Sequence, residues 1–360
     1  MAASSAPRSD TCAAVILRPG WRPLMTTLGP LVLANVAAGI LIAFAGRDPI
    51  AFYGDIFEAG LLNWNGFQES VNRMAPLLFI AAGLIVAFRA NVWNLGIDAQ
   101  FLLGAVMVAG LGPLMAGWMP SLVMAIVTIT VAALVGAAWT LLPAWLKVRH
   151  EVNEIITTVM TSFIGISLAR FLVKYPFRDP DSVIDQTRVI TLADRLPTLP
   201  GSRIHIGIVL GLVAILGVHF VVTRTSLGSR LDVVGFNRRA ARHAGLSVSR
   251  VIIVAFAISG ALIGIGGAVS IVGDWGSARS DWNPAWGFLV VPLIFLGRRH
   301  GVATAVFVAM FAVVSIGSQV AARRQELPLD FTYIVTGLIL LFLTITEYLE
   351  TRRERDRVDA

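Results

Sequence analysis

The chain has 360 residues, of which 56% are hydrophobic and only 14% are charged, and its mean hydropathy is +0.76. This composition excludes a soluble globular protein, because the apolar stretches lack the polar face that a soluble helix shows. The net charge of +7 does not indicate a nucleic-acid partner, since the basic residues are scattered over short loops where they set topology and contact anionic membrane lipid.

Apolar stretches that approach the length of a bilayer crossing, about 20 residues, recur along the chain. Seven of them are Leu24–Ala45, Leu122–Leu142, Ile155–Val173, Ile204–Val222, Val251–Ile271, Val302–Val320 and Phe331–Tyr348. Three shorter stretches, Ala75–Phe88, Phe101–Met115 and Gly287–Leu296, bring the expected crossings to ten. We therefore expect an all-α membrane protein with one transmembrane domain over residues 24–348, between cytoplasmic segments 1–23 and 349–360.

Ten crossings place both termini in the cytoplasm and most of the basic residues on the inner side, as the positive-inside rule requires. Two longer outer loops, residues 46–74 and 174–203, mix basic with acidic residues, and Arg323 and Arg324 violate the rule. Joining residues 75–115 into a single broken crossing would invert the loops that follow. We therefore expect two crossings in that region. The expected location is the bacterial inner (plasma) membrane.

The sequence predicts no catalytic site and no bound metal or cofactor. Cys12 is the only cysteine, and the five histidines show no metal-ligand spacing. Acidic residues are nearly absent from the predicted spans, unlike those of many ion-coupled carriers. A Walker A loop needs Gly-Lys-Ser/Thr, but the two lysines, Lys147 and Lys174, follow Leu146 and Val173. Any ATP and magnesium must therefore be bound by a partner.

Residues 235–246, GFNRRAARHAGL, form a basic loop of small residues between two apolar stretches. Asn237 is suited to cap a helix and Gly245 to end one, which predicts a short helix over residues 238–244, about 11 Å long. Within Val251–Ile271, the GxxxG spacing of Gly260 and Gly264 predicts close helix packing inside the subunit.

The charges of this predicted helix are unusual. Arg238 and Arg239 occupy the first turn, where the helix dipole disfavours cations, while Ala240 and Ala241 keep one side slim. We infer that an acidic partner surface compensates these two charges. Arg242 belongs to the same loop. The alternative is a solvated loop at the membrane edge.

Polar residues also gather between the two shorter stretches, at Asn91, Asn94, Asp98 and Gln100. Polar groups at membrane depth must face water, protein or ligand, and discontinuous helices commonly line transport sites. The alternative is that these residues cap helices at the cytoplasmic surface.

The stretch Ile155–Val173 carries four hydroxyl groups, at Thr157, Thr158, Thr161 and Ser162. They suit a sugar or nucleoside as hydrogen-bond donors. Each can instead bond back to the backbone of its own helix.

These residues carry a family resemblance. The pattern of Gly235, Asn237, Ala240, Ala241 and Gly245 resembles the GxNxxAAxxxG cytoplasmic loop of ABC importer permeases, in the branch that moves simple sugars, nucleosides and branched-chain amino acids. Three further blocks agree: FRANVWNLGIDAQ at 88–100 resembles FRAGLxNIGAEGQ, VNEIITT at 152–158, with Asn153 and Glu154, resembles VNEVITT, and GSRIHIG at 201–207 resembles GSRLHxG.

The resemblance implies a fold similar to the type II importer permeases, with about ten spans. It implies that two permeases form the pore, that cytoplasmic ATPases bind their inner loops, and that an extracytoplasmic solute-binding protein delivers the solute. VNEIITT favours the nucleoside and simple-sugar group, and FYGDIFEAG at 52–60 resembles the longer member of a permease heterodimer. Three departures, Asn91, Asp98 and Pro292, weaken any inference about substrate.

The resulting hypothesis is a permease subunit of an ATP-driven importer for a nucleoside or simple sugar, in which the partner ATPase pushes the 238–244 helix. An ion-coupled or facilitative carrier that works without an ATPase is the main alternative. A membrane enzyme is a third hypothesis, and no motif supports it.

Overall fold

The computed structural model describes residues 36–327 and, beyond them, residues 334, 337, 338, 341 and 345. The predicted cytoplasmic segments 1–23 and 349–360 lie outside these residues, as do most of the first and last predicted crossings. The described part of the chain is helical, and its only β-pairing consists of isolated bridges.

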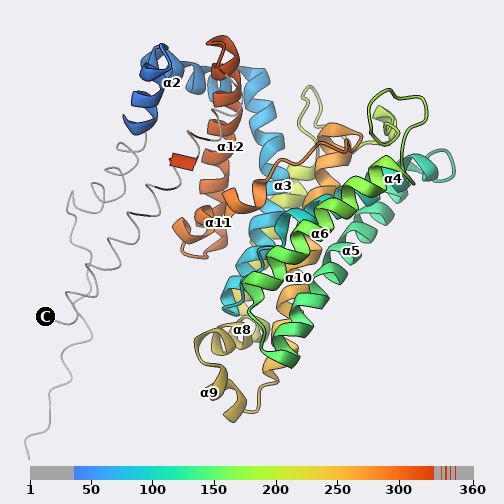
Figure 1. Ribbon diagram of the computed structural model, residues 1–360, viewed down its shortest axis with the longest axis vertical. Coiled ribbons are helices and arrows are strands. Elements are labelled where there is room, and N and C mark those ends of the chain that lie inside the picture. The colour runs from blue at the N-terminus through green and yellow to red at the C-terminus, as the bar shows by residue number, and fades with distance from the viewer. Residues whose placement is uncertain (1–35, 328–333, 335–336, 339–340, 342–344, 346–360) are drawn as a thin grey trace, which may run out of the picture.

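Seven long apolar helices in the described residues are long enough to cross a membrane (Figure 1). They are α3 (Trp64–Arg89), α4 (Ile97–Met115), α5 (Ser121–His150), α6 (Glu154–Lys174), α7 (Gly207–Arg224), α10 (Val248–Ser270, continued by the π-helix η3, Ile271–Trp275) and α12 (Gly301–Arg324). The shorter elements are α2 (Pro49–Phe57), η1 (Glu58–Leu62), η2 (Leu192–Asp194), α8 (Ser226–Phe236), α9 (Arg238–His243) and α11 (Trp286–Leu296).

The two short stretches in residues 75–115 belong to two separate helices, as expected. Ala75–Phe88 is only the second half of α3, which has 26 residues. Hydropathy does not identify its first half as part of a span, because that half carries polar side chains such as Gln68 and Asn72. Both amides are satisfied in the fold, since they bond to the backbone of Arg203.

The third short stretch forms a helix, but its expected crossing is not confirmed. α11 has 11 residues and spans about 16 Å, roughly half of the hydrocarbon thickness. Residues 276–285 lead into it in non-helical form. The helical part of this region is therefore too short to cross a membrane alone.

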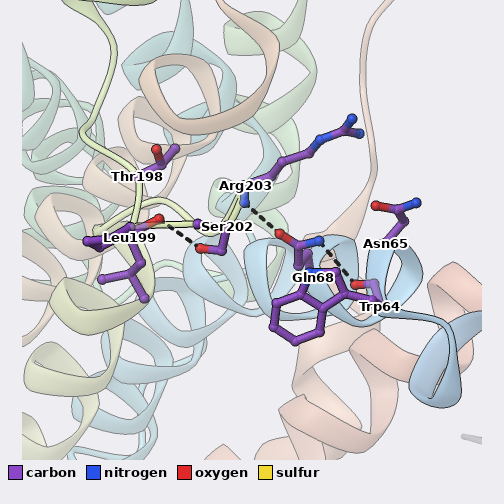
Figure 2. A pocket seen from close by; sticks show the side chains of 9 residues that line it. Trp64, Asn65, Gln68, Thr198, Leu199, Ser202 and Arg203 are labelled. Carbon is purple, nitrogen blue, oxygen red and sulfur yellow. Dashed lines mark hydrogen bonds between the residues drawn. The ribbon is translucent and has the colours of Figure 1, made fainter.

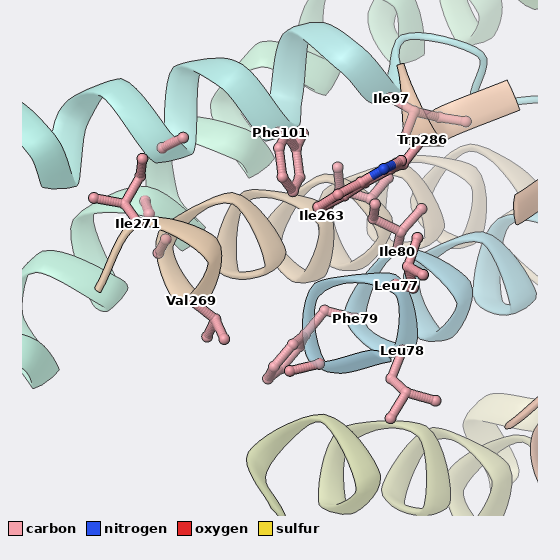
Figure 3. Packing of buried hydrophobic residues seen from close by; sticks show 14 of the residues in the cluster. Leu77, Leu78, Phe79, Ile80, Ile97, Phe101, Ile263, Val269, Ile271 and Trp286 are labelled. Atoms are coloured by element: carbon pink, nitrogen blue, oxygen red, sulfur yellow. The ribbon is translucent and has the colours of Figure 1, made fainter. Parts of the chain in front are cut away.

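α3 and α10 form the centre of the bundle, whereas α5 and α6 lie at its periphery. Within the most apolar 18 residues of each helix, 83% of the residues of α3 and 56% of those of α10 are buried. The corresponding shares are 28% in α5 and 22% in α6. Figure 3 shows side chains of α3, α4, α10 and α11 packed together, among them Leu77, Phe101, Ile263 and Trp286. Gly260 and Gly264 pack against the α5 backbone, where a Cβ atom would collide, which confirms that the GxxxG spacing serves packing inside the subunit.

The two ends of the bundle are built differently (Figure 1). The short helices α8 and α9 occupy one end, which we call the α9 end. The opposite end, called the loop end, holds α2, η1 and the long loop between α6 and α7. There Arg324 lies 2.6 Å from Asp55 and 3.2 Å from Glu58, so this apparent violation of the positive-inside rule is neutralised by nearby acids.

Candidate functional site

The helix predicted in the basic loop is present as α9. The Asn237 side chain accepts hydrogen bonds from the backbone N–H groups of Arg239 (2.9 Å) and Ala240 (3.0 Å). Gly245 adopts a φ of +79° just after the helix, a conformation that glycine takes without steric cost. The predicted cap and stop are both confirmed.

One side of α9 is turned away from the bundle. Ala241 is buried, but Ala240, Arg239 and Arg242 are exposed. No ion pair is found for either arginine within the described part of the chain. Phe236, directly before the cap residue, is 95% exposed. The end of the bundle thus presents two unpaired cations beside an uncovered aromatic ring.

Arg238 contacts the bundle directly. Its Nη2 donates a hydrogen bond to the carbonyl oxygen of Asn91 (3.1 Å) and lies 3.9 Å from Oε1 of Glu154. Arg238 therefore has an acidic neighbour within its own chain, in addition to the partner surface that was expected to compensate it. The chain's own Glu154 supplies part of that compensation.

α8 is anchored to the bundle on the same side. Arg89, at the end of α3, pairs with Asp232 of α8 at 2.8 Å. Gly235 packs so closely on the Arg89 carbonyl that a Cβ atom would collide with it. This contact explains why the loop needs glycine at position 235, and it holds the base of α9 in place.

Glu154 begins α6 and is buried there. The side chain of Asn153 caps the helix by accepting from the N–H of Ile155 (2.9 Å). Oε2 of Glu154 lies 2.7 Å from Nζ of Lys147 in the last turn of α5, and the two side chains are only 10% and 15% exposed. Sequence reasoning identified Asn153 and Glu154 as motif residues without a role and missed Lys147 as a partner. The pair could have been inferred from the sequence, because Lys147 and Glu154 carry opposite charges at the end of one predicted span and the start of the next.

Two members of the predicted polar cluster bind one another. Asn94 and Gln100 exchange two hydrogen bonds of 2.9 and 2.8 Å, and Nδ2 of Asn94 also donates to Oγ of Ser259 in α10 (2.9 Å). All three side chains are buried. Sequence reasoning missed Ser259, because one serine in an apolar stretch carries no signal.

The other two members lie elsewhere. Asn91 is exposed and has a φ of 51°. Asp98 is buried and accepts a hydrogen bond from the N–H of Gly287 (3.2 Å), at the start of α11. Asp98 therefore joins the break before α4, residues 90–96, to the break before α11, residues 276–285.

The hydroxyl groups of α6 mostly bond to their own helix. Thr157 and Thr161 donate to backbone carbonyls one turn earlier, and Ser162 is buried. Thr158 donates to the Glu154 carbonyl (2.6 Å) and also accepts from the N–H of Leu95 (3.2 Å). Thr158 thus connects α6 to the break that precedes α4.

The loop end contains a hollow of about 460 Å³, lined by Trp64, Asn65, Gln68, Thr198, Leu199, Pro200, Gly201, Ser202 and Arg203. Figure 2 shows that Gln68 lies between the backbones of Trp64 and Arg203. The Arg203 side chain points away from these bonds and is exposed. Two α3 amides therefore hold the GSRIHIG segment while its guanidinium is left available.

The chemistry of both ends is hydrogen bonding and ion pairing. Among the described residues, no three His, Cys, Asp or Glu side chains are grouped so as to hold a metal ion. The arrangement can hold a short helix against the bundle and present charged and aromatic groups beyond it.

Comparison with known proteins agrees with this arrangement. The family model described as branched-chain amino acid transport system / permease component matches residues 67–344. The glucose ABC transporter permease protein of Haloferax volcanii is 28% identical over 93% of this chain and 90% of its own length. The guanosine ABC transporter permease protein of Bacillus subtilis is 26% identical over 87% and 90%, and a nucleoside ABC transporter permease protein of Lactococcus lactis is 25% identical over 91% and 93%. The chain therefore belongs to the branched-chain amino acid transport system / permease component family.

Proposed function

We propose that this chain is the permease subunit of an ATP-driven ABC importer and forms the path for a nucleoside or simple sugar. The observation that carries the proposal is the family match over a bundle of membrane helices. Relatives named for glucose, guanosine and nucleosides support the substrate class. The chain is a transport component and not an enzyme, and ATP hydrolysis takes place on a separate subunit.

α9 is the site where a cytoplasmic ATPase docks. Arg239 and Arg242 are exposed and Phe236 is uncovered, a combination that is enriched at the centres of protein interfaces. The complementary ATPase surface carries carboxylates for the arginines and an apolar pocket for the ring. Closure of the ATPases on nucleotide then moves α9.

The solute path runs beside two non-helical segments, residues 90–96 between α3 and α4 and residues 276–285 before α11. Non-helical backbone at membrane depth has polar groups that a transported solute can use. Asn94 and Gln100 hold the first break in shape through their mutual bonds. Asn91, Asp98, Thr157, Thr158, Thr161 and Ser162 remain the candidates for solute contacts.

Two further partners complete the importer. The apolar faces of α5 and α6, where residues such as Ile156, Phe163 and Ile164 are exposed, lie against membrane lipid and a second permease subunit, as in a heterodimer. An extracytoplasmic solute-binding protein docks over the hollow of Trp64 and Arg203 at the loop end.

Reconstitution tests the proposal. Proteoliposomes that hold this chain with its ATPase, second permease and binding protein are expected to take up labelled guanosine or glucose only with ATP. The matched control carries an ATPase without its Walker A lysine. Uptake by the purified chain alone, driven by a solute or ion gradient without ATP, would establish the carrier hypothesis instead.

A further inference from the structure

Glu154 stands between two cations that belong to different parts of the molecule. Its Oε2 lies 2.7 Å from Lys147 of α5, and its Oε1 lies 3.9 Å from Arg238 of α9. The first contact is a close ion pair. The second is about 1 Å longer than a charge-assisted hydrogen bond, so a small displacement of α9 would close or break it.

Arg238 is therefore the residue of α9 that meets the bundle. Its guanidinium contacts both the start of α6, through Glu154, and the break before α4, through the Asn91 carbonyl. Its neighbours Arg239 and Arg242 are exposed. Arg242, one turn later on the same face of α9, lines a pocket of about 290 Å³ together with Arg238, Lys147 and Glu151. Arg239 is thus turned away from this contact.

A series of hydrogen bonds continues from Glu154 into the bundle. Thr158, one turn further along α6, donates to the Glu154 carbonyl at 2.6 Å and accepts from the N–H of Leu95 at 3.2 Å. The preceding residue, Asn94, is bonded to Gln100 and to Ser259 of α10. Polar contacts thus connect α9 to the interior of the helices.

We propose that Glu154 is a positioning residue that transmits the displacement of α9 to α6 and to the break before α4. We call this set of contacts the Glu154 relay, and it rests on the proposed function. Movement of α9 shifts Glu154 between Lys147 and Arg238, and α6 follows because Glu154 is its first residue. The relay gives Glu154 and Thr158 of the VNEIITT motif a role in coupling. The motif's resemblance to the family block does not indicate such a role.

The first test measures solute moved per ATP hydrolysed in the complete transporter. Glu154→Gln and Arg238→Gln are each expected to lower this ratio at least tenfold, while ATP hydrolysis continues at half the wild-type rate or more. Their double variant is expected to be no worse than either single variant, because both remove the same link. The control is Asp181→Asn, which removes an exposed carboxylate from the loop between α6 and α7 and is expected to stay within twofold of wild type.

The second test separates the relay from a structural role of the Lys147 pair. The exchange Lys147→Glu with Glu154→Lys restores an ion pair between α5 and α6, so the thermal midpoint and the membrane abundance should recover. Solute per ATP should remain at least tenfold low, because the cation introduced at position 154 faces Arg238. Full recovery of the ratio by this exchange would overturn the relay.

The relay and the proposed function can fail separately. ATP-independent uptake by the wild-type chain would overturn the proposed function. ATP-dependent uptake that Glu154→Gln leaves at the wild-type ratio would overturn the relay alone.

Discussion

Paired and unpaired arginines mark different surfaces of the bundle. Each end has both kinds, since Arg89 pairs with Asp232 at the α9 end and the exposed Arg203 at the loop end has no ion pair among the described residues. At the loop end, Arg178, Arg279 and Arg324 each lie within 4 Å of a carboxylate. At the α9 end, Arg239 and Arg242 are exposed and lack such a partner within the described residues. Exposed ion pairs contribute only about 0.2–1 kcal/mol each, so the pairs at the loop end chiefly neutralise charge. Arg239 and Arg242 can instead form ion pairs with carboxylates of a partner, so their interaction energy contributes to binding.

Exposed aromatic residues occur at both ends of the bundle. Phe236 is 95% exposed at the α9 end, and burial of a phenylalanine side chain yields about 1.5–3 kcal/mol. At the loop end, Trp118, Tyr175 and Trp64 are exposed, and of these three Trp64 borders the same hollow as Arg203. Each proposed docking surface therefore combines an uncovered ring with an exposed arginine.

Site-directed labelling tests whether the two ends lie on opposite sides of the membrane, and its outcome is all or none. Cys12 is the only native cysteine, so a Cys12→Ser background is free of thiols. Val183→Cys, at a position 99% exposed in the loop end, should react with an impermeant maleimide added to intact cells. Arg242→Cys should react only after the membrane is opened. Labelling of Arg242→Cys in intact cells would place α9 outside and refute ATPase docking.

Charge reversal at the α9 end should give the largest functional loss. The double variant Arg239→Glu with Arg242→Glu should reduce ATP-driven uptake at least 100-fold, because each reversal turns an attraction to an acidic partner into repulsion. Both side chains are exposed, so membrane abundance should not change. The control is Arg279→Glu at the loop end, expected to retain uptake within about threefold. Equal losses at both ends would remove the difference between them.

Truncation of the exposed ring should have a smaller effect. Phe236→Ala should weaken binding of the ATPase about 10-fold to 100-fold, the range that loss of a buried interface aromatic produces. The thermal midpoint of the isolated chain should not change, since the ring contacts little of it. Val233→Ala, at a position 42% exposed in the same helix, serves as the control. A drop in the midpoint with unchanged ATPase binding would mean that Phe236 packs on its own chain.

Much of the fold was predictable because hydropathy reports length and burial. Seven of the predicted stretches fall on the seven long helices, and the stretch Gly287–Leu296 and the predicted helix in the basic loop fall on α11 and α9. The start of α3 was not predictable, because Gln68 and Asn72 look unfavourable until their bonds to the Arg203 backbone are known. The shortness of α11 was visible, because the apolar stretch Gly287–Leu296 begins directly after the polar residues 276–285.

The candidate site was predictable in its residues but not in its contacts. Asn237 and Gly245 follow local rules for helix ends, which depend on neighbouring positions only. The orientation of Arg238 depends on Glu154 and Asn91, which are far away in the chain. The partnership of Asn94 with Ser259 is of the same kind. Long-range contacts of single polar residues leave no periodic pattern from which to infer them.

The smallest expected effect concerns the ion pair at the loop end. Arg324 lies 2.6 Å from Asp55, and the two side chains are 43% and 19% exposed. Solvent screening limits such a pair to about 1 kcal/mol or less, so Arg324→Gln should lower the thermal midpoint by at most a few degrees and leave uptake unchanged. A double-mutant cycle with Asp55→Asn measures the pair itself, and its coupling energy should stay below about 1 kcal/mol. If Arg324→Gln instead abolished uptake at an unchanged midpoint, this paired arginine would be needed for uptake, as we propose for the unpaired arginines Arg239 and Arg242. The presence of an ion pair would then not tell whether an arginine belongs to a docking surface.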